Sequence, residues 1–147
     1  MTIPAPRLAR RGRILIIDDE KDLTDVTRDG LSGLHDVMTT QDARQALEWI
    51  ASGDRFDLIP CNMMMPLMTG MEFYTWLQAL LPQQATRVVF MTGGAFTPRA
   101  REFLARLPNL RLEKPFDVDH ILAMVSAHLD GWSHSGAAAL GSAELRS

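Results

Sequence analysis

The chain has 147 residues, of which 46% are hydrophobic and 22% are charged, and its formal net charge at pH 7 is −3. This length suffices for one domain with a sizeable core, and the small negative charge gives no electrostatic reason to expect nucleic acid or an anionic membrane as a partner. No apolar run approaches the ~20 residues of a membrane span, and no signal-peptide core opens the chain. Cys61 is the only cysteine, so an intrachain disulfide is impossible. We therefore expect a cytoplasmic protein.

Short apolar runs alternate along the chain with segments of helical period, which predicts strand–helix units and a parallel sheet. The expected strands cover residues 13–18, 35–40, 56–61, 87–91 and 110–112. We expect helices at about 21–33, from Asp42 to Gly53, around 73–81 and ending before Pro82, from Thr97-Pro98 onward, and at about 117–130.

Side-chain patterns suggest how several of these elements begin and which faces they bury. The buried face of the first helix is predicted from Leu23, Val26, Gly30, Leu31 and Leu34, and that of the third from Phe73, Trp76, Leu77, Leu80 and Leu81. Asp42 has the character of an N-cap, with Gln45 at the spacing of a capping box. Pro60 is unusual for a central strand, because proline cannot donate to the hydrogen-bond ladder.

Five strand–helix units predict a flavodoxin-like, doubly wound α/β fold, with a five-stranded parallel sheet of order 2-1-3-4-5 and five helices. This domain should cover residues 13–130, preceded by a basic lead-in at 1–12 and followed by a flexible tail at 131–147. In such sheets ligands bind beyond the carboxyl ends of the strands. One pocket can therefore gather five residues at expected strand ends, Asp18, Asp19, Asn62, Thr92 and Lys114.

These residue types suit phosphoryl transfer assisted by a metal ion. Two adjacent carboxylates, Asp18 and Asp19, need a cation or water between them, and hard oxygen ligands with room for water suit Mg²⁺. The ammonium of Lys114 can hold a phosphate and the hydroxyl of Thr92 can donate to one. Phosphoryl transfer relies on this kind of positioning and charge neutralisation.

Four motifs in order, Ile14–Glu20, Asp57–Gly70, Phe90–Gly94 and Glu113–Phe116, resemble the CheY-like receiver domain of two-component response regulators. The stretches Thr92–Arg99 and Leu112–Phe116 look most like receivers at the C-terminus of hybrid sensor histidine kinases. The resemblance implies a non-enzymatic signalling module that meets a sensor histidine kinase or a phosphotransfer domain. It also implies a partner or homodimer surface formed by the fourth helix, fifth strand and fifth helix.

The resemblance also assigns roles to residues. Asp18 and Asp19 would hold Mg²⁺ together with the phosphoacceptor side chain and the backbone carbonyl of Met64. Thr92 matches the hydroxyl residue that moves to the phosphoryl group. Lys114 matches the lysine that pairs with that group, and the bond to the following Pro115 is usually cis in the family.

Two positions depart from the family pattern. Asn62 stands where the family has its phosphoacceptor aspartate, and an amide is uncharged and a poor nucleophile. We therefore expect no phosphorylation at this position and weak or absent Mg²⁺ binding, with Asp19 as the nearest other carboxylate. Arg111 stands where the family often has an aromatic switch residue. Arginine is too polar to be buried in the same way, so we expect a solvated residue on an edge strand and no coupled switching.

Other features are interpreted as structural. Five methionines follow Asn62 within ten residues and should pack in the loop and core, Cys61 should be a buried and inert thiol, and the four histidines should lie at the surface. The fourth helix is basic through Arg99, Arg101 and Arg106, as a solvated face or as a partner surface. Two alternative functions are a Mg²⁺-dependent phosphatase or hydrolase and a nucleotide- or flavin-binding module, but neither fits the acidic segment Asp18–Asp22 after the first strand.

Overall fold

The structure, a computed structural model, describes residues 11–93 and 97–133. Most of the predicted basic lead-in, the glycine-containing segment 94–96 and nearly all of the predicted tail, including His134, lie outside the described residues. The first described side chain, Arg11, is not simply solvated. Its guanidinium donates to the carbonyl oxygens of Ser32 and Gly33 at 3.1 and 3.3 Å and pairs with Asp36.

Five parallel strands form one sheet in the order β2-β1-β3-β4-β5, so the predicted fold class is confirmed. The strands are β1 (Arg13–Ile17), β2 (Asp36–Thr40), β3 (Ile59–Asn62), β4 (Val88–Thr92) and β5 (Arg111–Glu113). The described helices are α2 (Lys21–Leu31), α3 (Ala43–Ala51), α4 (Gly70–Leu80), α5 (Pro82–Ala85), α6 (Pro98–Ala105) and α7 (Val118–Ser133). Pro82 begins the short helix α5, which the sequence did not predict, and α7 continues to Ser133 rather than ending at Asp130.

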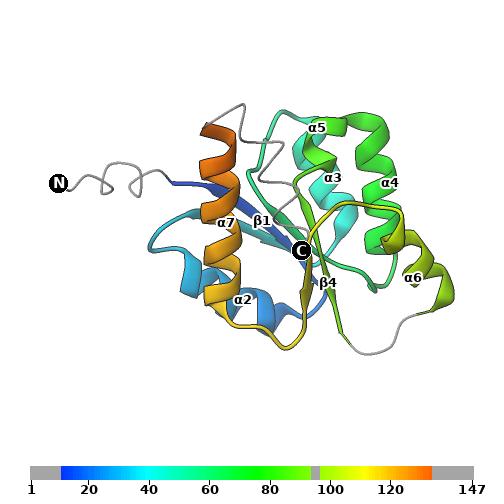
Figure 1. Ribbon diagram of the computed structural model, residues 1–147, viewed down its shortest axis with the longest axis horizontal. Coiled ribbons are helices and arrows are strands. Elements are labelled where there is room, and N and C mark those ends of the chain that lie inside the picture. The colour runs from blue at the N-terminus through cyan, green and yellow to red at the C-terminus, as the bar shows by residue number, and fades with distance from the viewer. Residues whose placement is uncertain (1–10, 94–96, 134–147) are drawn as a thin grey trace.

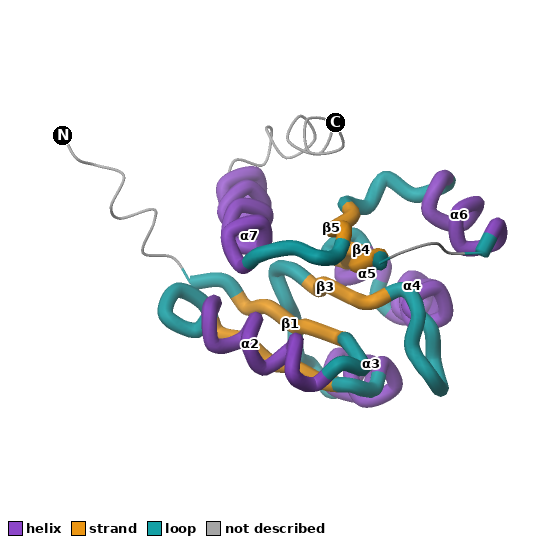
Figure 2. The backbone as a smooth tube through the Cα atoms, turned by 90° about the horizontal axis from the view of Figure 1, so that it is seen from below, coloured by secondary structure: helices purple, strands orange, loops and turns teal. Residues whose placement is uncertain are grey.

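Helices cover both faces of the sheet, with α2 and α7 on one side and α3, α4, α5 and α6 on the other (Figures 1 and 2). Strand β1 contributes to both cores because successive side chains point to opposite faces. Leu15 and Ile17 pack with the larger helix group, whereas Ile14 and Ile16 pack with α2 and α7. The strand is therefore buried on both faces, which explains its continuous apolar run.

The predicted buried faces of α2 and α4 were partly wrong. Leu31, Phe73 and Leu77 are buried, but Val26 and Trp76 are 65% and 62% exposed, and Leu34 and Leu80 are also exposed. Helix α2 buries Thr24 and Thr27 instead, and their hydroxyls donate to the carbonyls of Lys21 and Leu23 at 2.8 Å. A threonine whose hydroxyl is satisfied within its own helix can be buried, so the buried stripe of α2 is rotated away from Val26.

The helix starts follow the expected chemistry with one exception. Thr97 caps α6 and Pro98 occupies its first turn, as predicted. Asp42 caps α3, as predicted, by accepting a hydrogen bond from the backbone N–H of Arg44. The predicted capping box with Gln45 was wrong, because the side-chain oxygen of Gln45 accepts from the Thr40 hydroxyl. A capping box does form at α4, between Thr69 and Glu72.

Pro60 is buried inside β3 and interrupts one ladder of the sheet. The N–H of Ile59 donates to Arg87 beside β4, and the carbonyl of Leu58 accepts from Leu15 in β1. Because successive residues of a strand point their backbone groups to opposite sides, the missing N–H of Pro60 falls on the side of β1. The β1–β3 pairing accordingly consists of Ile14 with Leu58 and Ile17 with Cys61, with a gap between them.

No helix among the described residues is long and apolar enough to cross a membrane.

Candidate functional site

The five predicted site residues converge at the carboxyl end of the sheet. Asp18 and Asp19 follow β1, Asn62 and Thr92 are the last residues of β3 and β4, and Lys114 follows β5. β1 lies between β2 and β3, so the strand order reverses at this point and leaves a crevice where ligands bind in such sheets.

Gly70 allows the loop after Asn62 to fold tightly back against β3. Its N–H donates to the carbonyl of Met63 at 2.9 Å. A Cβ atom at this position would lie 2.5 Å from the carbonyl oxygen of Asn62 and 3.0 Å from the Cα of Met63. Only glycine permits this approach without a shift of the backbone, so the start of α4 helps to fix the end of β3.

The amide nitrogen of Asn62 lies among three oxygen atoms. Its Nδ2 is 3.3 Å from Oδ1 of Asp18, 3.1 Å from Oδ1 of Asp19 and 3.0 Å from the carbonyl oxygen of Met64. All three partners can only accept a hydrogen bond when the carboxylates are ionised, so the atom that faces them has to be the donating nitrogen. These three oxygens are the ones that the family resemblance assigns to Mg²⁺.

Lys114 is held by two carboxylates rather than one. Its Nζ lies 2.8 Å from Oδ2 of Asp18 and 3.0 Å from Oε1 of Glu20. Its backbone N–H donates to the carbonyl of Thr92 at 2.7 Å, and the bond from Lys114 to Pro115 is cis, as expected. The role of Glu20 was not predicted, although it is the third acid of the segment Asp18–Glu20.

Burial and ion pairing act against each other at Asp18 and Lys114. Asp18 is fully inaccessible, and this burial raises the pKa of its carboxyl, while the hydrogen bonds from Lys114 and from the backbone N–H of Glu20 lower it. Burial alone would lower the pKa of Lys114. Its hydrogen bonds to Asp18 and Glu20, together with the charges of these two carboxylates, outweigh burial and raise that pKa, so the lysine stays charged.

The side chains as arranged do not fit a divalent cation. Mg²⁺ requires oxygen ligands in nearly octahedral geometry, but Asn62 directs N–H groups at three of the oxygens, and Lys114 takes the second oxygen of Asp18. Within residues 11–93 and 97–133, no three His, Cys, Asp or Glu side chains are grouped so that they could hold a metal ion.

A cavity of about 250 Å³ opens over the site. Its lining includes Glu20, Asn62, Met64, Thr92 and Lys114. Thr92 is only 7% exposed, so this residue is buried within the site rather than lying on the open surface.

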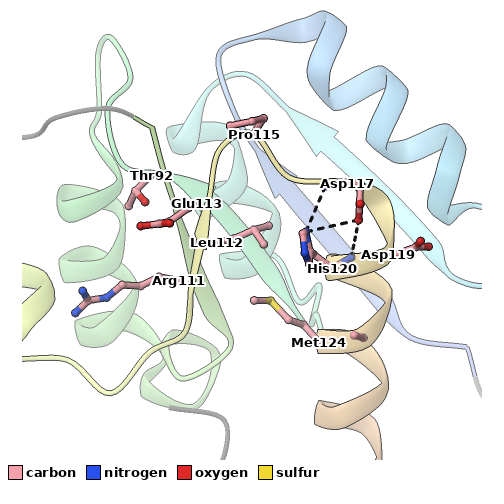
Figure 3. A pocket seen from close by; sticks show the side chains of 10 residues that line it. Thr92, Arg111, Leu112, Glu113, Pro115, Asp117, Asp119, His120 and Met124 are labelled. Atoms are coloured by element: carbon pink, nitrogen blue, oxygen red, sulfur yellow. Dashed lines mark hydrogen bonds and ion pairs between the residues drawn. The ribbon is translucent and has the colours of Figure 1, made fainter. Parts of the chain in front are cut away.

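A larger cavity, of about 770 Å³, lies beside the site between β5 and α7 (Figure 3). Thr92, Arg111, Glu113 and His120 contribute to its lining. Arg111 is exposed on the edge strand, as predicted, and its Nη2 also donates to the carbonyl of Leu104 in the last turn of α6 at 2.7 Å. A cation at this end of a helix is favourable, so this contact ties β5 to α6.

The methionines after Asn62, the single cysteine and the histidines follow their predicted burial only in part. Met63 and Met65 are buried and Met68 and Met71 pack against the core, as predicted, although Met64 is half exposed. Cys61 is fully buried, as predicted, and burial raises the pKa of its thiol, which disfavours the reactive thiolate. The surface prediction for His35 was wrong, because it is 8% exposed and accepts a hydrogen bond from Gly12.

Residues 14–126 match the response regulator receiver domain family. The chain belongs to this family. Receiver domains take part in two-component signal transduction, interact with histidine kinases and are not enzymes in themselves, so the phosphatase or hydrolase alternative is set aside. Receiver domains typically bind Mg²⁺. In this chain the Asn62 amide nitrogen instead lies among the three oxygens that the family resemblance assigns to the ion.

Two curated relatives and one solved structure illustrate the similarity. The response regulator MprA of Mycolicibacterium vanbaalenii is 31% identical over 118 residues, which are 80% of this chain and 50% of the relative. The DNA-binding transcriptional regulator NtrC of Azospirillum brasilense is 29% identical over 118 residues, 80% of this chain and 24% of the relative. This receiver therefore spans half or less of the curated relatives it matches. A CheY-like receiver domain protein from Methanospirillum hungatei is 24% identical, with a TM-score of 0.71 over 82% of this chain and 95% of that one, and shows the same fold.

Proposed function

We propose that this receiver domain acts in two-component or phosphorelay signalling through protein contacts, without accepting a phosphoryl group at position 62. Asn62 is the observation that carries the proposal. It occupies the end of β3, where the family resemblance expects the acceptor aspartate, and its amide nitrogen is held by Asp18, Asp19 and Met64. An amide cannot form the acyl phosphate that a carboxylate forms.

The rest of the site keeps the residues of the family pattern. Thr92 and Lys114 stand where a hydroxyl and an ammonium would meet a phosphoryl group, and Asp18 and Asp19 remain as an acidic pair. With Asn62 in place of an aspartate, two carboxylates rather than three would face a metal ion, so Mg²⁺ binds weakly or not at all.

The proposed partners are a sensor histidine kinase or a phosphotransfer domain. The motifs from Thr92 to Arg99 and from Leu112 to Phe116 support a placement at the C-terminus of a hybrid sensor histidine kinase in the cytoplasm. The surface of α6, β5 and α7 would serve for partner contacts or a homodimer, since it presents exposed Arg99, Arg101 and Arg111. The Arg111–Leu104 contact favours a fixed rather than a switching surface.

Intact-mass measurement after incubation with acetyl phosphate and Mg²⁺ tests the proposal. We expect no phosphoryl adduct on the parent protein, and one adduct on Asn62→Asp, because the substitution restores a carboxylate nucleophile beside Thr92 and Lys114. An Asn62→Ala variant serves as the matched control, since it lacks both the amide and the carboxylate and should gain no mass.

An adduct on the parent would contradict the proposal. Fragmentation would then locate the acceptor, with Asp19 as the first position to inspect. If Asn62→Asp also stayed unmodified while folded, the pocket would differ from a phosphoacceptor site in more than residue 62, and a role in binding alone would be the better description.

A further inference from the structure

The contacts of Asn62 carry a consequence beyond the loss of a nucleophile. Its Nδ2 lies 3.0–3.3 Å from Asp18 Oδ1, Asp19 Oδ1 and the Met64 carbonyl. An uncompensated cluster of two carboxylates and a carbonyl is unfavourable, because each oxygen is an acceptor and two of them carry charge. Some donor has to lie between them, and here the donor is built into the chain.

The geometry points to a specific role for Asn62, in which its amide group takes the place of the metal ion in this receiver and makes the pocket independent of metal. Two N–H bonds are shared among three oxygens, and Lys114 neutralises the far oxygen of Asp18 at 2.8 Å. Glu20 holds the same ammonium from the other side at 3.0 Å. Every charged group of the cluster therefore has a partner from the chain itself.

This arrangement differs from a site that has merely lost one carboxylate. If charge count alone weakened metal binding, Asn62→Ala would respond to Mg²⁺ as the parent does, because both keep Asp18, Asp19 and the Met64 carbonyl. If the amide occupies the position between the oxygens, removal of the amide frees those oxygens. Asn62→Ala should then bind Mg²⁺ better than the parent, although it has no additional carboxylate.

Thermal unfolding with EDTA or with excess MgCl₂ separates these cases, with NaCl of equal ionic strength as the control. In EDTA we expect the parent to have the highest melting temperature. Asn62→Ala should be lower because it loses the shared donor, and Asn62→Asp should be lowest because three carboxylates then face one another. With Mg²⁺ the parent should not shift, Asn62→Ala should shift slightly, and Asn62→Asp should rise by about 5 °C at roughly tenfold excess over its dissociation constant.

NMR of the parent protein tests the same role of Asn62 without requiring any variant to fold. The side-chain NH₂ pair of Asn62 in a ¹⁵N–¹H spectrum of the parent should exchange slowly with solvent and should not move when MgCl₂ is added. A saturable shift of this pair, or a Mg²⁺ response of the parent equal to that of Asn62→Ala, would overturn the inference.

Independence of the pocket from metal depends on the contacts of the Asn62 amide and not on the route of signalling. A metal-independent pocket could still belong to a protein that is phosphorylated on another residue, which the mass measurement would reveal. Conversely, a parent that binds Mg²⁺ could still lack an acceptor. The two experiments can therefore fail separately.

Discussion

His35 shows how a single polar side chain becomes part of the core of this domain. It lies between α2 and β2, and its Nδ1 accepts a hydrogen bond from the backbone N–H of Gly12 at 2.9 Å. Only a neutral imidazole can accept at this nitrogen. Burial lowers the pKa of His35, and the nearby charge of Arg11 lowers it further against the opposing effect of Asp57 and Asp36.

This lowered pKa predicts that the free energy of unfolding decreases as the pH falls. The unfolded chain takes up the proton near pH 6.5, whereas the folded chain takes it up at a lower pH. The stability contributed by neutral His35 is therefore complete above pH 6.5 and is lost progressively below it, until the folded pKa is reached. Urea unfolding at a series of pH values from 8 to 5 measures the effect.

His35→Gln is the control for this prediction, because glutamine can accept from Gly12 but does not titrate. His128, whose pKa burial also lowers, will leave part of the pH dependence in place. If the variant and the parent lose stability equally with falling pH, His35 is not responsible.

The residue types at the carboxyl ends of the predicted strands were sufficient to predict which side chains meet in the site. Asp18, Asn62, Thr92 and Lys114 each terminate or follow a strand, and parallel strands end at the same edge. The direction of the Asn62 amide and the reach of Glu20 to Lys114 could not be predicted, since both depend on side-chain torsions. His35 was missed for a similar reason, because its partner is a backbone group 23 residues away.

At the scale of elements, α2 and α7 approach closely through a glycine. A Cβ atom on Gly30 would lie 2.7 Å from Cγ2 of Val118, at the start of α7. Strands β1 and β4 were predicted from their apolar runs, whereas the buried face of α2 was predicted only in part, because its buried threonines look polar in the sequence. Helix propensity would favour alanine over Gly30 by about 1 kcal/mol, but the contact with α7 opposes this gain.

A double-mutant cycle between these two positions should reveal the contact. We expect Gly30→Ala to destabilise the parent, because the short, stiff side chain of Val118 has little room to move. In a Val118→Ala background the same change should stabilise by up to about 1 kcal/mol. Urea unfolding gives each value.

Gly33→Ala is the matched comparison, because a Cβ there meets nothing within 4 Å. It should show no coupling to Val118→Ala. Additive effects of Gly30→Ala and Val118→Ala would mean that α2 and α7 do not press on each other at this point.

At the scale of the whole molecule, two cores share one sheet. Leu15 and Ile16 are neighbours in β1 and both are buried, yet they belong to opposite clusters. Loss of β1 from the sheet would therefore remove contacts from both clusters at once. The alternation of strands and helices was enough to predict a doubly wound parallel sheet, whereas its strand order was predicted from the likeness to flavodoxin-like folds.

The shared strand predicts that the domain unfolds in one cooperative step. Leu15→Ala and Ile16→Ala should each cost about 2–5 kcal/mol, and each should lower the urea midpoint measured by tryptophan fluorescence and by far-UV circular dichroism to the same extent. Separate transitions for the two probes in either variant would show that the two sides of the sheet unfold independently.

Cys61 lies in the middle strand of this sheet, fully buried, with a thiol whose pKa is raised by burial. An alkylating reagent needs both access and a thiolate, and burial in the folded domain disfavours both. Under native conditions the only thiol of the chain will therefore be labelled no faster than the sheet opens around it, so the rate of Cys61 alkylation reports the rate of that opening.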